Sequence, residues 1–218
     1  EVNCETDFAA KDNLFHQFVN NIAKLILENN LDNIDQLNQQ SFEEFENIEE
    51  YRRFIISKLG ENITIRRFQR IKIDGQIGSY IHGTKIASLV VIDVNDAELA
   101  KDIAMHVAAS KPEYISASDI PEEIVTEETR VLTLQAEEEG KPQEIIEKIV
   151  QGKLRKQFDQ ITLTGQEFVK DPDITINQLL TQKKASVNSF IRYEVGEGIE
   201  IEAVNFVDEV KAQVNAIK

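Results

Sequence analysis

The stretch DGQIGSYIHGTKIASLVVID, residues 74–93, decides the fold class. Residues 77–81 lie between two turn signals and predict a β-strand, and residues 86–93 form the short apolar run of a buried strand. Gly83 and Thr84 lie between the two runs and predict a tight turn. Because a hairpin joins strands that run in opposite directions, this stretch predicts an antiparallel sheet.

Further strands are predicted on both sides of this stretch. Isoleucines recur with period two at Ile63 and Ile65 and again at Ile71 and Ile73, and residues 190–195 alternate in the same way. The Asp74-Gly75 dipeptide is typical of two-residue hairpins. We therefore expect a strand at residues 71–73 to pair with the strand at 77–81.

Helical periodicity surrounds these strands. Apolar side chains spaced three and four residues apart predict helices from Asp12 to about Asn29, over about residues 41–57, and from Asp96 to about Ser110. Thr175 is expected to cap a short helix. This mixed order of helices and hairpin-linked strands indicates the α+β class rather than a doubly wound α/β sheet.

Residues 121–161 carry two charged, amphipathic helical patterns around Gly140 and Pro142. A glycine that ends one helix and a proline at the first turn of the next predict an antiparallel helical hairpin. Its apolar seams are narrow, so we expect it to project from the main body as an arm.

These patterns predict a two-lobed core of helices packed on antiparallel sheets. We assign residues 1–75 to an N-terminal lobe and residues 76–120 and 162–200 to a C-terminal lobe. The arm takes residues 121–161, and a C-terminal helix module takes residues 201–218, where apolar side chains again have helical spacing.

Composition and charge exclude several classes of protein. The 218 residues carry a net charge of −15, which argues against nucleic acid or an anionic membrane surface as the main partner. An uninterrupted apolar run of about 18 residues, which a membrane-spanning helix needs, is missing. The single cysteine, Cys4, cannot build an internal disulfide framework or a multi-cysteine zinc site, and a reducing, cytoplasmic location is the simpler interpretation.

Signals of catalysis are weak. The sequence has no Walker phosphate loop, glycine-rich dinucleotide fingerprint or HExxH motif. Cys4, His16, His82 and His106 are the only residues that could form a cysteine–histidine nucleophile, and His106 follows Ile103 on the inner side of a helix. We therefore expect His106 to have a core or capping role, and we expect neither enzymatic activity, nor a cofactor, nor a metal.

A basic segment contrasts with the acidic whole. Between residues 52 and 72 the only acidic residue is Glu61, while arginines and lysines recur. One interpretation is an RNA-binding patch on which Phe68 stacks against a base. The other, which we favour, is an internal counter-charge for the acidic helices.

The loop of Thr6, Asp7 and Phe8 allows two interpretations. Phe8 is either a hydrophobic staple that packs on Phe15 or an exposed aromatic knob that enters a partner. The spacing of these residues does not separate the two.

Five ordered blocks resemble the bacterial translation elongation factor Ts family. They are VNCETDFAAKD (2–12), GENI (60–63), GSYIHG (78–83), IAMHVAASKP (103–112) and FIRYEVGEG (190–198). The small helical domain with which members of that family begin has no counterpart here, so the resemblance covers the core and the C-terminal part.

The resemblance implies a guanine nucleotide exchange factor that binds the GTPase EF-Tu in its GDP-bound and nucleotide-free states, without binding nucleotide itself. It implies that the loop of Thr6, Asp7 and Phe8, with the Asp-Phe pair as a wedge, and the segment at Leu59 and Gly60 contact the GTP-binding domain of EF-Tu.

The same resemblance implies that His82 and Val169 meet the third domain of EF-Tu, and that residues 121–161 form a coiled-coil arm. The alternatives are an RNA-binding module that uses residues 52–72, and a fragment that binds EF-Tu without exchange activity. A dimer is compatible with the sequence.

Overall fold

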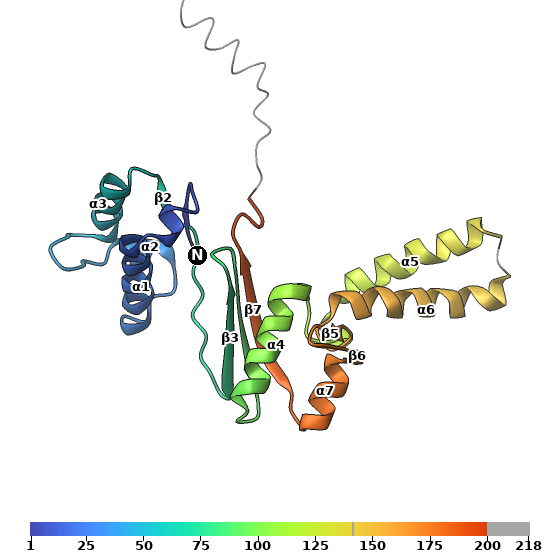
Figure 1. The fold of residues 1–218 in the computed structure, drawn as a ribbon. Helices are drawn as coiled ribbons and strands as arrows, with labels where there is room; N and C mark the ends of the chain where they lie inside the picture. The colour runs from blue at the N-terminus through green and yellow to red at the C-terminus, as the bar shows by residue number, and fades with distance from the viewer. Residues whose placement is uncertain (141, 200–218) are drawn as a thin grey trace, which may run out of the picture.

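The computed structural model describes residues 1–140 and 142–199, and Figure 1 shows their arrangement. Helices alternate with antiparallel sheets along the chain, which confirms the α+β class. The predicted C-terminal helix module, residues 201–218, lies outside the described residues. Among the residues described, no helix combines the length and the apolar character that crossing a membrane requires.

The first group of elements packs three helices beside a two-stranded antiparallel sheet. Its members are β1 (Val2–Cys4), the 3-10 helix η1 (Ala9–Lys11), α1 (Asn13–Glu28), α2 (Ile34–Asn38), α3 (Ile48–Leu59) and β2 (Ile63–Ile65). Helix α1 begins where the sequence predicts, because the Asp12 carboxylate accepts the Leu14 N–H at 2.7 Å. The apolar faces meet in what we call the N-terminal core, whose fully buried members include Phe18, Leu37, Ile48, Ile55 and Ile63.

The second group is built on a three-stranded antiparallel sheet in the order β3-β4-β7. Its strands are β3 (Gln76–His82), β4 (Ile86–Ile92) and β7 (Val187–Glu194), and helix α4 (Ala97–Ser110) crosses one face (Figure 1). The smaller elements are η2 (Ala117–Asp119), β5 (Glu167–Phe168), β6 (Asp171–Thr175) and α7 (Ile176–Lys183), which Thr175 caps as predicted. Their buried side chains form the sheet core, which includes Val90, Ile92, Ile103, Val107, Leu163 and Ile176.

Helix α4 lies unusually close to the sheet. Gly78 of β3 is buried against the backbone of Ala100, so a Cβ atom at this position would overlap the Ala100 carbonyl. On the next strand, the Ser88 hydroxyl donates a hydrogen bond to the Ala104 carbonyl at 2.5 Å. Two neighbouring strands thus hold successive turns of the helix.

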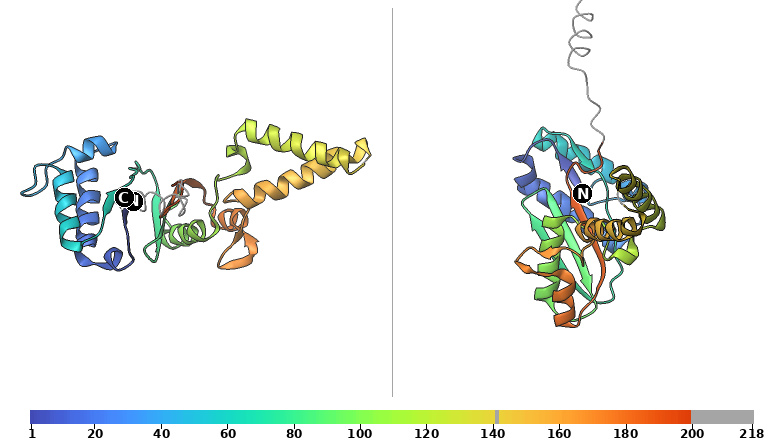
Figure 2. Two further views of the ribbon diagram at one scale, coloured as in Figure 1. Left: turned by 90° about the horizontal axis from the view of Figure 1, so that it is seen from above. Right: turned by 90° about the vertical axis from the view of Figure 1, so that its right-hand side faces the viewer.

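The predicted helical hairpin is present. Helices α5 (Glu122–Glu138) and α6 (Gln143–Ile161) run antiparallel and project from the body (Figures 1 and 2). The hairpin has a small apolar cluster of its own, formed by Leu132, Ala136, Ile146 and Val150 with the partly buried Leu154. The description of this arm as a coiled coil, and the proposed domain boundaries, stay predictions.

The helix predicted over residues 41–57 is wrong at its start. Helix α3 begins at Ile48, because the Asn47 side chain accepts the Glu50 N–H at 2.9 Å and so caps the helix there. Phe42 and Phe45 form a tight hydrogen-bonded turn instead, and both rings stack on Tyr51. Helix α2 was not predicted.

The strand predicted at residues 71–73, and the hairpin turn at Asp74-Gly75, are also wrong. Residues 66–75 form no strand. The backbone N–H groups of Arg66 and Arg67 bond to the Glu1 carbonyl, which ties the chain to the N-terminal group of elements rather than to β3. Ile71 and Ile73 instead line an apolar hollow on the face of the sheet opposite α4, together with Ile77, Leu89 and Ile191.

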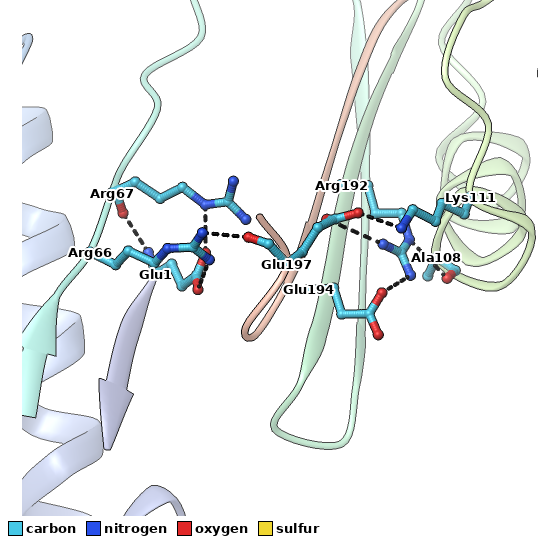
Figure 3. A network of polar contacts seen from close by, with 8 residues as sticks. All are labelled: Glu1, Arg66, Arg67, Ala108, Lys111, Arg192, Glu194 and Glu197. Carbon is cyan, nitrogen blue, oxygen red and sulfur yellow. Dashed lines mark hydrogen bonds and ion pairs between the residues drawn. The ribbon is translucent and has the colours of Figure 1, made fainter. Parts of the chain in front are cut away.

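A polar network joins the two groups of elements, and we call it the inter-core network. It consists of Glu1, Arg66, Arg67, Lys111, Arg192, Glu194 and Glu197 (Figure 3). The Glu1 side chain is only 4% exposed and is held by Arg66 Nη1 at 2.8 Å and Arg67 Nε at 2.5 Å. Arg66 also donates to the Glu197 carbonyl beyond β7, so the network connects the two cores.

The close approach of α4 predicts that Gly78→Ala lowers the free energy of unfolding by about 3 kcal/mol, or the melting temperature by roughly 10 °C, because the added methyl group has no space. The matched control is Gly152→Ala in helix α6, where nothing lies within 4 Å of the position that the new methyl group would take and where alanine favours the helix by about 1 kcal/mol. Thermal melting followed by circular dichroism measures both. Equal melting temperatures for Gly78→Ala and the parent would contradict the close packing.

The separate apolar cluster of the arm predicts that the arm can be removed. Replacing residues 123–157 by a short Gly-Ser linker keeps the Ile161 carbonyl, which accepts N–H bonds from Glu113 and Tyr114 at the base of the arm. The ends of an antiparallel hairpin are close, so closing the gap costs little loop entropy. We expect a single cooperative melting transition in circular dichroism, whereas loss of cooperativity would show that the arm is part of the core.

Candidate functional site

The loop of Thr6, Asp7 and Phe8 is held firmly between β1 and η1. The Thr6 backbone N–H and hydroxyl donate to the two carboxylate oxygens of Glu61, at 3.0 and 2.5 Å. The Thr6 hydroxyl also accepts the Ala9 N–H at 3.3 Å. The loop is therefore fixed at its first residue by a side chain 55 positions away in the sequence.

Leu59 and Gly60 lie next to this anchor in the chain. Helix α3 ends at Leu59, and its C-cap residue Gly60 has φ of 74° and donates its N–H to the Ile56 carbonyl at 2.8 Å. This left-handed conformation favours glycine and turns the chain so that Glu61 reaches Thr6. The structure thus brings together five of the predicted partner contacts, namely Thr6, Asp7, Phe8, Leu59 and Gly60.

Phe8 is an exposed knob. Its side chain is 81% exposed, the highest value for any large apolar residue that the structure describes, while Phe15 is buried in the N-terminal core. The interpretation of Phe8 as a staple against Phe15 is therefore wrong. A large aromatic side chain in water on an anchored loop is the usual composition of a binding hot spot.

Asp7 is charged and points into solvent. A hydrogen bond from Lys11 at 2.8 Å, together with its positive charge, holds the pKa of the Asp7 carboxyl below its usual value. The charge of Lys85 acts in the same direction. Lys85 lies in the turn between β3 and β4.

That turn follows His82, the last residue of β3. Strand alternation places Gly78, Tyr80 and His82 on the face of the sheet that α4 covers. The His82 ring is exposed, and its Nδ1 lies 3.2 Å from the Tyr80 hydroxyl. His82 therefore ends a rigid strand and is accessible to a partner.

Val169 lies in the tight turn between β5 and β6, and its side chain is 44% exposed. Its backbone N–H bonds to Nδ1 of the buried His106 at 3.2 Å. Within the part of the chain that the structure describes, no hydrogen bond joins His82 and Val169, and each bonds to a different partner. The predicted core role of His106 is confirmed, since its side chain is fully buried.

The arginines of residues 52–72 bind partners within the chain. Arg52 and Arg53 pair with Glu49, and Arg70 pairs with Asp32 at 2.8 Å. Arg66 and Arg67 belong to the inter-core network, and Phe68 packs on the N-terminal core. These contacts support the counter-charge interpretation over the RNA-binding one.

Chemistry at Cys4 has little support. Burial raises the pKa of the thiol, and the nearby Glu61 charge raises it further, so Cys4 is not an activated nucleophile. In residues 1–140 and 142–199 there is no cluster of three or more His, Cys, Asp or Glu side chains that would hold a metal ion.

Sequence reasoning missed the residues that hold the exposed points. Glu61 anchors Thr6, and Gln166 accepts a hydrogen bond from His106 at 2.9 Å. Their polar side chains carry no local pattern, because each has a partner at least 55 residues away. Glu61 had one signal, since it is the only acidic residue in a basic segment.

Comparison with known proteins identifies the family of the chain. A family model described as "Elongation factor TS" matches residues 5–197. Elongation factor Ts of Legionella pneumophila (strain Paris) is 48% identical over 214 residues, which cover 98% of this chain and 73% of the relative. Those of Methylococcus capsulatus and Hydrogenovibrio crunogenus are 48% and 47% identical, and this chain covers 74% of each. Matches of this extent confirm the resemblance read from the five sequence blocks, and the chain belongs to the elongation factor Ts family.

Proposed function

We propose that this chain binds the translation GTPase EF-Tu and accelerates the release of its bound GDP, acting in the cytoplasm during polypeptide elongation. Membership of the elongation factor Ts family supports this function. The observation that carries it is Phe8, an 81% exposed aromatic side chain on a loop anchored by Glu61. An apolar side chain held in this way enters a partner pocket with little loss of conformational entropy.

The proposed contact surface has two parts. Thr6, Asp7, Phe8, Leu59 and Gly60 form the part that would meet the GTP-binding domain, and His82 and Val169 form the part that would meet the third domain. The inter-core network fixes the first part relative to the second.

Exchange of this kind breaks no covalent bond. A protein that lowers the affinity of EF-Tu for GDP must itself bind the GDP form more weakly, by the same factor. We therefore propose that the chain is not an enzyme, needs no cofactor and binds no nucleotide of its own. RNA binding is not proposed, because the arginines of residues 52–72 pair within the chain.

The direct test is stopped-flow release of a fluorescent GDP from EF-Tu, with and without this chain. We expect the release rate to rise with the concentration of the chain and to saturate. Binding without faster release would show a fragment that attaches to EF-Tu but does not exchange nucleotide. Absence of both would refute the proposed function.

Phe8→Ala is expected to reduce the stimulated release rate by roughly 30-fold, which corresponds to about 2 kcal/mol of lost hot-spot energy. The melting temperature should stay within about 2 °C of the parent, since an exposed side chain contributes little to folding. Leu27→Ala is the matched control, because Leu27 is 67% exposed on α1 and outside the proposed surface. If both variants exchange normally, Phe8 is not the wedge.

His82→Ala is expected to weaken the affinity for nucleotide-free EF-Tu by roughly fivefold to tenfold, or about 1 kcal/mol, without changing the melting temperature. Isothermal titration calorimetry measures this affinity. His16→Ala, a change of the exposed histidine on α1, is the control. An unchanged dissociation constant for His82→Ala would remove this residue from the interface.

A further inference from the structure

His106 lies at the centre of a hydrogen-bond network whose direction can be assigned. Gln166 donates from its amide nitrogen to the carbonyls of Ser110 and Gln160, at 3.3 and 2.6 Å, so its amide oxygen faces His106 Nε2 at 2.9 Å. An amide oxygen only accepts, and therefore Nε2 carries the ring proton. The other ring nitrogen, Nδ1, is left as an acceptor.

The Nδ1 acceptor is used by the backbone of Val169. The Val169 N–H donates to Nδ1 at 3.2 Å, and the Ser110 hydroxyl lies 3.5 Å from the same atom. The imidazole is fully buried, and burial lowers its pKa, although the Gln166 hydrogen bond opposes this, so the ring stays neutral. A neutral ring is the form that can accept the Val169 N–H.

The neighbours of Val169 are fixed as well. Phe168, just before it, is buried in the sheet core and lies beside the His106 ring. Lys170, just after it, places its ammonium group 2.9 Å from both carboxylate oxygens of Asp102. Asp102 and His106 are one turn apart on α4, so one face of this helix holds both sides of the β5–β6 turn.

These contacts leave the Val169 side chain as the exposed part of an otherwise anchored turn. The residue before it is buried, the residue after it is ion-paired, and its own N–H is bonded, yet the side chain is 44% exposed. Fixing the backbone of one residue costs about 1–2 kcal/mol of conformational entropy. Because the turn is already fixed in the folded chain, a partner does not have to supply this free energy on binding.

We propose that His106, assisted by Asp102, is a positioning residue that presents Val169 to EF-Tu. His106 does not touch the partner and acts through the Val169 backbone. This inference rests on the proposed function, because it assigns a role within the part of the surface formed by His82 and Val169.

The test is a double-mutant cycle on the affinity for nucleotide-free EF-Tu, measured by calorimetry at a temperature where every variant is folded. His106→Phe removes both ring hydrogen bonds, and Val169→Ala removes the presented side chain. We expect each single change to weaken binding by about fivefold to tenfold, and the double variant to be no weaker than the worse single one. Independent, multiplying effects would overturn the proposal.

A conservative variant separates positioning from general stability. The Oδ1 atom of His106→Asn can accept the Val169 N–H in place of Nδ1, while the bond to Gln166 is lost. We expect this variant to lose melting temperature but to bind EF-Tu within about twofold of the parent. A loss of affinity that follows the melting temperature through both His106 variants would show a merely structural role and overturn the proposal.

Asp102→Asn keeps the test decisive if His106→Phe fails to fold. It removes the charge pair with Lys170, and we expect it to weaken binding about threefold in the parent but not in the Val169→Ala background. Glu28→Gln, which removes the exposed Lys24 pair on α1, is the matched control and should leave affinity unchanged. An equal effect of Asp102→Asn in both backgrounds would contradict positioning.

A failure of this inference can be distinguished from a failure of the proposed function. If Val169→Ala alone leaves the affinity unchanged, this inference is wrong, because the side chain that His106 holds is not part of the interface. The proposed function is judged separately, by whether the parent chain accelerates GDP release.

Discussion

The close seating of helix α4 on the three-stranded sheet is the constraint on which the rest of the structure depends. At Gly78 the backbones of strand and helix touch, and the Ser88 hydroxyl fixes the next turn. On β7, Arg192 donates to the carbonyl of Ala108 at 3.2 Å. These contacts fix the side of α4 that faces the sheet. Other side chains of the same helix bond to the β5–β6 turn that carries Val169.

The inter-core network connects the sheet and α4 to the N-terminal core. Exposed ion pairs contribute little to stability, about 0–1 kcal/mol each, but Glu1 is 4% exposed, and removing one partner of a buried pair leaves a charge uncompensated. The Arg67 guanidinium also stacks on the Tyr193 ring of β7, 4.1 Å from its centre. We interpret the network as setting geometry rather than as a large store of folding energy, since it ties Glu1, Arg66 and Arg67 to the segment that follows β7.

The sequence predicts those parts of the fold that depend on neighbouring residues. Helices α1 and α4 begin where Asp12 and Asp96 cap them, and the β3–β4 hairpin follows from an apolar run and the turn signal before it. The predicted strand at residues 71–73 had the right period, and in the described part of the chain the outer edge of β3 has no strand partner. Ile71 and Ile73 nevertheless line the apolar hollow on the face of the sheet instead of pairing at that edge. Alternation of apolar and polar residues indicates which side of an extended segment is apolar. It does not indicate whether another strand pairs with that segment.

In the candidate site, too, features that depend on neighbouring residues could be predicted and features that depend on distant contacts could not. The exposed residues could be found, through the family resemblance, at Asp7, Phe8, His82 and Val169, whereas spacing alone left Phe8 between knob and staple. The residues that hold them, Glu61 and Gln166, could not be found, because a hydrogen bond across 55 or 60 positions leaves no trace in local sequence. At Phe8 and Val169 an apolar side chain is thus exposed to water, while the loop that carries it is already held by hydrogen bonds within the fold. A partner that buries Phe8 or Val169 gains the apolar contact without having to order the loop, so little of the binding free energy is spent on fixing the backbone.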